Sequence, residues 1–379
     1  MELRAITDDE VGAFRASLLT TFGEDPGEGD PDGDRRFRAL IAPGQAWAAF
    51  DRGVCVATAG TLELELGMPG GGTLAMAGLT MVSVRPTHRR RGILRELMKL
   101  HLDDARARGR AIGGLWASEA TIYGRFGYAP AVWGDALEIT GARGLEVGGG
   151  GDDVEWLDEA RAREVLPEVY ARATARRPGV LRRSSVWWRE RRFQEQGFVR
   201  RGASQRRHVL AVRDRAPVGY LAFRQRVAHG PMHPGGRLEI IELVATDPRA
   251  TASLWQFALA VDLFPTVAWS NAPVDDPLVH LVSDRRSVTR KRADTLWLRF
   301  EDVGAVLAAR GLEGCALTVG DRTYGEGPAV EVAPHALPAL VMGGARATEL
   351  AQAGLVRGDV IAAERALATP LAPWCPEIF

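Results

Sequence analysis

The spacing of apolar and polar positions predicts one densely patterned stretch near the N-terminal third of the chain. Residues 79–84 read as an apolar strand, residues 93–104 as an amphipathic helix, and residues 112–118 as a second apolar strand. The run Arg-Arg-Arg-Gly at 89–92 lies between the first strand and the helix, and an aromatic, glycine-containing segment at 119–128 follows the second strand. This order predicts a helix packed on a sheet.

The first residues predict a capped helix followed by a polar loop. Thr7 and Glu10 have the spacing of a capping box, and the next apolar residues recur on one helical face. Residues 23–34 are acidic and rich in turn formers, which indicates a solvated loop or, alternatively, a lid whose carboxylates attract a cationic substrate. Residues 45–59 and 61–66 then predict a β-hairpin.

A glycine-rich segment at 141–153 reads as a linker, and we place the first domain boundary there. Two helices are expected after it, at 157–176 and 186–196, the second carrying Trp187, Trp188 and Phe193 as core residues. Strands are expected at 208–213, 219–226 and 237–245.

The segment 241–261 repeats the order of strand, proline-containing turn and helix. Asp247 is the expected N-cap and Pro248 the first helical residue. The basic glycine loop is absent, because Arg-Ala-Thr-Ala stands at 249–252. Either the unit is a duplication whose second copy has lost cofactor binding, or two similar units arose by chance.

The last part of the chain predicts a smaller α+β unit. An apolar strand at 295–300 is expected to close the second domain. A helix after Asp302, strands at 316–319 and 329–332, and helices at 345–353 and 360–367 are expected to follow. The final residues 370–379 are apolar and contain three prolines, so they cannot be helical throughout, and we expect them to dock against the protein.

Composition narrows the class of protein. The length of 379 residues predicts two or three domains, and 46% hydrophobic with 25% charged residues is typical of a soluble globular protein. A net charge of zero argues against a nucleic-acid binder, and no apolar run is long enough to predict a membrane span. The acidic start does not resemble a signal peptide, and three widely spaced cysteines suit a reducing compartment, so we expect a cytoplasmic protein.

The arginine run before the helix predicts a phosphate-binding loop. First-turn N–H groups lack partners inside a helix, and the helix dipole favours an anion at that end. Gly92 would let the backbone approach a ligand closely, while the arginines add positive charge. No metal site is expected, because the glycine and prolines around His229 and His233 exclude the helix that would align these two side chains.

On these residues the stretch resembles motif A of the GNAT N-acetyltransferases, Arg/Gln-x-x-Gly-x-Gly/Ala. Arg89 and Gly92 match the motif, and Leu94 stands where a small residue is usual. Residues 84–94, 117–119 and 122–128 resemble more closely the enhanced intracellular survival (Eis) family of actinobacterial acetyltransferases.

The Eis resemblance implies an α/β (α+β) architecture of tandem GNAT folds, the second degenerate, followed by a sterol-carrier-protein-like α+β domain. The expected domains are residues 1–148, 149–301 and 302–379. The resemblance also implies a homohexamer built from two trimers, which light scattering can test.

The resemblance further implies the residues of the active site. Tyr123 would be the general acid that protonates the leaving thiolate, and the terminal carboxylate of Phe379 would be the base that takes the amine proton. Acetyl-CoA, as co-substrate, would be held by Val82, Ser83, Val84, Arg90, Arg91, Gly92, Ile93, Leu94, Arg95, Ser118 and Glu119.

These observations predict an acetyl-CoA-dependent N-acetyltransferase that moves an acetyl group directly to a primary amine of a cationic small molecule, resembling an aminoglycoside or a polyamine. The residues 24–34 and Glu377 are the expected acidic contacts of that substrate. No nucleic acid, membrane or metal is expected as a partner. Two alternatives stay open at this point: a protein-lysine acetyltransferase and a non-catalytic acyl-CoA- or lipid-binding protein.

Overall fold

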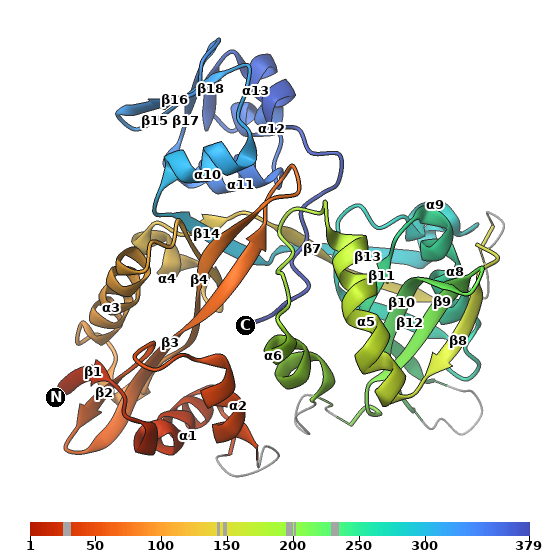
Figure 1. Cartoon of the computed structure of the whole chain (residues 1–379), viewed down its shortest axis with the longest axis horizontal. Coiled ribbons are helices and arrows are strands. Elements are labelled where there is room, and N and C mark those ends of the chain that lie inside the picture. The colour runs from red at the N-terminus through yellow and green to blue at the C-terminus, as the bar shows by residue number, and fades with distance from the viewer. Residues whose placement is uncertain (26–31, 142–144, 147–149, 195–199, 201, 229–234) are drawn as a thin grey trace. The chain divides into compact units, whose positions relative to one another are not determined.

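A computed structural model describes residues 1–25, 32–141, 145–146, 150–194, 200, 202–228 and 235–379. The chain forms two compact units (Figure 1). Unit 1 comprises Met1–Val132, Thr295–Pro370 and Glu377–Phe379, and unit 2 comprises Trp133–Asp294 and Leu371–Pro376. Because both units are discontinuous in sequence, the boundaries expected near residues 148 and 301 stay predictions.

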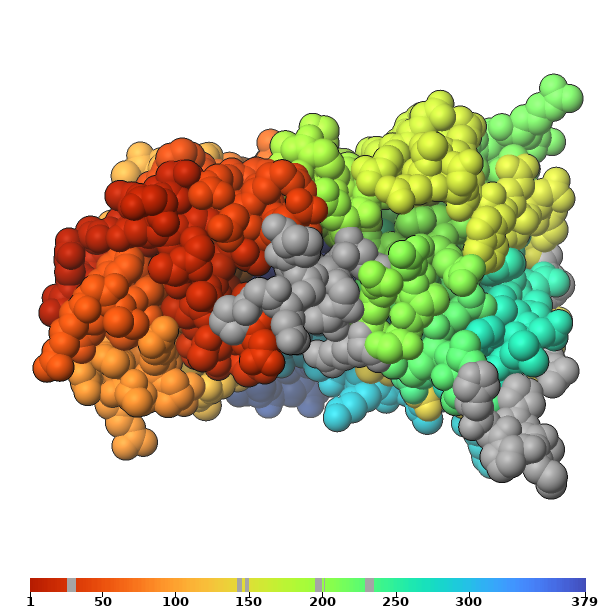
Figure 2. All heavy atoms as spheres, turned by 90° about the horizontal axis from the view of Figure 1, so that it is seen from below, coloured from red at the N-terminus to blue at the C-terminus, as the bar shows by residue number. Residues whose placement is uncertain are grey.

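Unit 1 contains a seven-stranded sheet of order β1-β2-β3-β4-β5-β14-β6. Its strands are β1 (Glu2–Ala5), β2 (Ala46–Asp51), β3 (Val54–Gly67), β4 (Thr73–Val84), β5 (Ile112–Trp116), β6 (Ala129–Pro130) and β14 (Leu296–Phe300). The accompanying helices are α1 (Val11–Phe22), α2 (Gly33–Leu40), α3 (Ile93–Ala107) and α4 (Ala120–Tyr123), with short 3₁₀ turns at Asp8–Glu10, Pro86–His88 and Gly124–Phe126. In the space-filling view the N-terminal part of this unit, red to orange, forms one continuous body (Figure 2).

Local sequence signals place the first elements of unit 1. The capping box is present before α1, since the Thr7 N–H donates to Glu10 Oε2 at 2.9 Å. The predicted hairpin is also present, but its turn lies at Arg52 and Gly53, both with positive φ, and β3 runs unbroken to Gly67. The expectation of a strand break at residue 60 was wrong, because Gly60 stays paired with Thr80 inside the sheet.

Strand β14 corrects the expectation that residues 295–300 close the second domain. Leu296–Phe300 instead pairs antiparallel with β5 and also with β6, so it lies in the sheet of unit 1. An apolar pattern marks a strand but not its partner. Here the partner strand precedes β14 by about 180 residues, as in the pairing of Trp297 with Leu115.

Unit 2 contains a second seven-stranded sheet, of order β13-β7-β12-β11-β10-β9-β8. Its strands are β7 (Trp133–Thr140), β8 (Asp153–Leu157), β9 (Arg207–Arg213), β10 (Ala216–Arg226), β11 (Arg237–Ala245), β12 (Thr266–Pro273) and β13 (Val288–Asp294). The helices are α5 (Glu159–Thr174), α6 (Ser185–Trp187), a π-helix (Trp188–Phe193), α8 (Pro248–Ala260) and α9 (Leu278–Leu281), with a 3₁₀ turn at Arg285–Ser287. Trp187 and Trp188 are buried, which confirms their prediction as core residues.

The C-terminal part of unit 1 is a small α+β domain with a four-stranded sheet of order β16-β15-β17-β18. It consists of α10 (Val303–Arg310), β15 (Ala316–Val319), β16 (Arg322–Tyr324), β17 (Ala329–Val332), α11 (Leu337–Met342), α12 (Ala347–Gln352), β18 (Val356–Gly358) and α13 (Val360–Leu367), with a 3₁₀ turn at Pro334–Ala336. Within the described ranges, no helix is both long and apolar enough to cross a bilayer.

A buried ion pair lies in the core of unit 2. Glu242 of β11 is 1% exposed, contacts the guanidinium group of Arg183, and accepts hydrogen bonds from Arg192 at 2.8 Å and the Tyr220 hydroxyl at 2.6 Å. Burial alone would raise the pKa of Glu242, but the two arginine charges hold this pKa at about 2. The Arg183 guanidinium also stacks 3.7 Å from the centre of the Tyr170 ring.

Replacing this carboxylate should destabilise unit 2. Glu242→Gln removes the charge that both guanidinium groups contact, and breaking a buried ion pair costs about 3–5 kcal/mol. We expect the free energy of unfolding in guanidinium chloride to fall by that amount. Glu239→Gln, on the same strand but in a partly exposed pair with Arg226, should cost less than about 1 kcal/mol. Equal losses of unfolding free energy in the two variants would contradict the conclusion that the buried ion pair of Glu242 stabilises unit 2.

The sign of the pH effect follows from the lowered pKa. The folded-state pKa of Glu242, about 2, lies below the pKa of an unfolded glutamate, about 4.3. Its stabilisation is therefore complete above about pH 4.3 and is lost as the pH falls toward 2. The stability difference between the unchanged chain and Glu242→Gln should shrink over the same interval.

Candidate active site

Strands β4 and β5 pair over three residues and then separate. Parallel pairs join Met76 to Ile112, Ala77 to Gly113 and Gly78 to Gly114. Beyond these pairs lies a cavity of about 710 Å³, formed by the end of β4, the turn and first residues of α3, the segment 118–126 after β5, and the last residues of α1. It is lined by Thr21, Phe22, Val82, Ser83, Val84, His88, Arg89, Arg90, Gly92, Ile93, Leu94, Arg95, Ser118, Glu119, Ile122, Tyr123, Arg125 and Phe126.

A β-bulge shapes the β4 side of this cavity. Thr58 pairs with Ser83 and Gly60 with Thr80, so Ala59 faces two residues of β4. Met81, one of those two, has a φ of 56°, and its carbonyl accepts a hydrogen bond from Thr58 Oγ1 at 2.7 Å. A bulge bends a strand and redirects the residues after it. The sequence reasoning missed this feature, because a methionine gives no signal for positive φ.

The turn between β4 and α3 has the backbone of an anion-binding loop. Arg90 has a φ of 63° and Gly92, the N-cap of α3, a φ of 81°. Among the described residues, nothing except the two chain neighbours of Gly92 lies within 4 Å of the position that a Cβ would take there, so a ligand can approach the backbone at this N-cap. Left-handed residues in such a turn orient successive N–H groups into one concavity, which suits a phosphate.

Positive side chains surround this loop. Arg89, Arg90 and Arg95 are exposed and line the cavity. Arg91, which the sequence also predicted as a cofactor contact, is not among the lining residues, and its Nη2 donates to the Thr87 carbonyl at 3.0 Å. The other ten predicted cofactor residues all line the same cavity. Their role in binding acetyl-CoA stays a prediction.

Tyr123 ends the short helix α4 and lies on the β5 side of the cavity. Its side chain is buried, at 6% exposure, although it contributes to the cavity wall. Burial raises the pKa of the Tyr123 phenol, and a hydrogen bond with Ser118 opposes the shift. The phenol is therefore protonated at neutral pH and can donate a proton into the cavity.

A buried polar contact fixes α3 to the sheet beneath the cavity. His101 of α3 lies 2.7 Å from Thr61 Oγ1 through Nδ1 and 3.0 Å from the Tyr128 hydroxyl through Nε2. Burial lowers the pKa of His101 to about 4, so the ring is neutral at pH 7. A Cβ at Gly113 would lie 2.7 Å from the Tyr128 oxygen, and the glycine there makes room for this contact.

The C-terminal residue returns to the point where β4 and β5 separate. Cε2 of Phe379 lies 3.2 Å from the position that a Cβ would take at Gly78, the last residue of β4 that pairs with β5. Phe379 and Tyr123 thus belong to the same compact unit, although Phe379 is not among the lining residues. Its assignment as the base stays a prediction.

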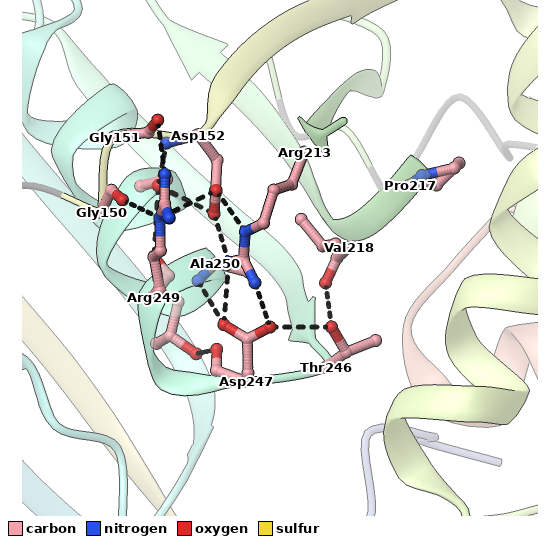
Figure 3. A network of polar contacts seen from close by, with 12 residues as sticks. Gly150, Gly151, Asp152, Arg213, Pro217, Val218, Thr246, Asp247, Arg249 and Ala250 are labelled. Atoms are coloured by element: carbon pink, nitrogen blue, oxygen red, sulfur yellow. Dashed lines mark hydrogen bonds and ion pairs between the residues drawn. The ribbon is translucent and has the colours of Figure 1, made fainter. Parts of the chain in front are cut away.

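The corresponding helix start in unit 2 is closed by carboxylates (Figure 3). Asp247 caps α8 by accepting from the Ala250 N–H at 3.0 Å, and Pro248 follows at the first helical position, which confirms the sequence prediction. Arg213 bridges Asp247 at 3.0 Å and the buried Asp152 at 2.8 Å. Hydrogen bonds to Arg213 lower the pKa of both carboxyl groups, so both stay negative at neutral pH.

Some of the other predicted positions lie outside the residues that the structure describes. His229, His233 and residues 26–31 of the acidic loop lie outside the described residues. Asp34, expected in that loop, instead lies in α2 and forms an ion pair with Arg15 at 2.5 Å, and Glu377 is 3% exposed. Their role in binding a cationic substrate stays a prediction.

Comparison with known proteins agrees with this geometry. Residues 2–131 and 179–300 each match an acetyltransferase (GNAT) domain, and residues 298–376 match a sterol carrier protein domain. The chain is 34% identical over 415 residues to an uncharacterised N-acetyltransferase of Streptomyces coelicolor, covering 100% of both proteins. It is 33% identical over 270 residues to the N-acetyltransferase Eis of Mycobacterium bovis, covering 66% of this chain and 61% of that protein.

The structure is likewise similar to a solved member of that group. The crystal structure of Eis1 from Mycobacterium abscessus superposes with a TM-score of 0.83 and 28% sequence identity, over 100% of each chain. The architecture is therefore two GNAT domains followed by a sterol carrier protein domain. The chain is an N-acetyltransferase and belongs to the Eis family of GNAT enzymes.

Proposed function

We propose that this enzyme transfers the acetyl group of acetyl-CoA directly to a primary amine of a small cationic molecule. The observation that carries the proposal is the cavity between β4 and β5, which combines an open, arginine-rich helix start with a buried tyrosine. Its volume of about 710 Å³ lies in the usual range for ligand sites, about 300–1,000 Å³.

The lining residues fit the chemistry of acetyl-CoA. The pyrophosphate is an anion, which the α3 N-terminus and the side chains of Arg90 and Arg95 would hold. The amide-containing pantetheine arm can hydrogen-bond like an added strand along Val82–Val84, where β4 has already parted from β5. When bound, acetyl-CoA supplies an activated acyl group, and the protein supplies position and proton transfer.

Two groups of the chain would move the protons. An alkyl ammonium cannot attack a thioester until it loses a proton, and the terminal carboxylate of Phe379 would accept that proton, directly or through water. Tyr123, whose phenol is protonated at neutral pH, would donate to the departing thiolate. A terminal carboxylate has a pKa of about 3.5 in water and becomes a stronger base when desolvated.

Acceptor specificity can be tested directly. The purified protein is mixed with acetyl-CoA and a panel of polyamines, aminoglycosides and lysine peptides, and free thiol is followed. We expect thiol release with small polycationic amines. A preference for lysine peptides would instead favour protein-lysine acetylation. No release with any amine, together with no binding of CoA in calorimetry, would overturn the proposal.

Removal of the Tyr123 hydroxyl tests the acid. We expect Tyr123→Phe to lower kcat by about 10²–10⁴, the usual contribution of general acid catalysis, while the Kd for CoA is unchanged. The unchanged enzyme should lose activity only above about pH 10, because burial raises the pKa of this phenol above its ordinary value. Tyr128→Phe is the control, since its buried hydroxyl contacts His101 outside the cavity. Equal losses of kcat in the two variants would contradict the role of Tyr123 as the general acid.

Extension of the C-terminus tests the base. Two added glycines would move the terminal carboxylate away from Phe379, so we expect kcat to fall by at least about 10² while CoA still binds. The control is Ile378→Ala, which changes a 60% exposed side chain and leaves the carboxylate in place. Full activity of the extended chain would argue directly against the terminal carboxylate as base.

A further inference from the structure

Four arginine side chains that line the cavity have no carboxylate partner among the residues that the structure describes. They come from two separate segments of unit 1 and are Arg89, Arg90, Arg95 and Arg125. Glu119 is the one carboxylate among the described residues that line the cavity, so positive charge is in excess there. Positive charges that line one cavity repel one another, and an anionic ligand would offset that repulsion.

The arginines at the other end of α3 show that exposure alone does not explain this lack of partners. Arg106 contacts Asp103 at 3.1 Å, and Arg108 contacts Asp104 at 2.9 Å, although both arginine side chains are exposed. Carboxylates are thus present beside the arginines that lie away from the cavity. The unpaired arginines are concentrated where a ligand can reach them.

Arg125 differs from the other three arginines in the segment that carries it. The other three belong to the loop before α3 and to its first turn, whereas Arg125 lies in the 3₁₀ turn Gly124–Phe126, after β5. Its side chain is exposed, and its Nε donates to the Ile122 carbonyl at 3.4 Å. The two Nη groups have no partner among the described residues, so both can donate to a ligand.

Coenzyme A carries phosphate in two places. The pyrophosphate joins pantetheine to adenosine, and a separate phosphate on the ribose 3′-oxygen carries nearly two negative charges at pH 7. The pyrophosphate fits the start of α3, where backbone N–H groups and the side chains of Arg90 and Arg95 are available. The 3′-phosphate lies several bonds away from the pyrophosphate and therefore needs a cation outside that helix start.

We propose that Arg125 recognises the 3′-phosphate of the donor and makes the enzyme selective for thioesters of coenzyme A. Of the four unpaired arginines, Arg125 alone comes from outside the loop and α3, so it can hold a second phosphate without competing for the pyrophosphate. A guanidinium group whose Nη atoms are available can bind two phosphate oxygens at once. The inference rests on the proposed use of acetyl-CoA as the donor.

Two ligands that differ by one phosphate test the inference. Coenzyme A and 3′-dephospho-coenzyme A are each titrated by calorimetry into the unchanged chain, Arg125→Gln and Arg95→Gln. Arg95 is the matched comparison, because it is also exposed and lines the same cavity but belongs to the first turn of α3. Neither substitution removes a buried side chain, and melting temperatures check that both variants are folded.

We expect the unchanged chain to bind coenzyme A about five- to thirtyfold more tightly than the dephospho compound at low salt, as a charged hydrogen-bonded contact at an exposed site would give. In Arg125→Gln this preference should fall to less than twofold, because only the affinity for coenzyme A is lost. Arg95→Gln should weaken both ligands by a similar factor and keep the preference. Arg125→Lys, which keeps the charge but loses the paired donors, should keep part of the preference.

Four results would overturn the inference: no preference in the unchanged chain, equal weakening of both ligands in Arg125→Gln, unchanged affinity of that variant for coenzyme A, or an equal loss of preference in Arg95→Gln. The proposed function fails differently. Binding of neither ligand by the unchanged chain would remove both proposals, whereas acetyl transfer from acetyl-CoA without discrimination between the two ligands would remove the inference alone.

Discussion

The parting of two neighbouring strands is the constraint on which the rest of the site depends. β4 and β5 stay paired only as far as Gly78 and Gly114, and the cavity occupies the gap beyond. The bulge at Met81 bends β4 on one side of the gap, and α3 begins on the same side with its N-terminus open. Tyr123 closes the other side. Each group in the proposed chemistry is placed by the position of this gap.

The two GNAT domains differ most clearly at the start of one helix. In the first, a glycine caps α3 without a side-chain hydrogen bond, so the partial positive charge of the helix is available to a ligand. In the second, Asp247 caps α8 with its own carboxylate and Asp152 lies close by. The carboxylate of Asp247 accepts from the helix start and pairs with Arg213, so a donor and a positive charge that a phosphate would use are already occupied by the chain itself. This gives a physical reason for the expectation that a duplicated second copy would have lost cofactor binding.

Local signals predicted much of the fold and of the cavity. Thr7, Asp247 and the helix after Gly92 were found from capping and periodicity, because these depend on residues within one turn. The pairing of β14 with β5 was missed, since alternation does not specify a distant partner. The positive φ of Met81 was missed for another reason: the bulge is imposed by the neighbouring strand and not by residue type.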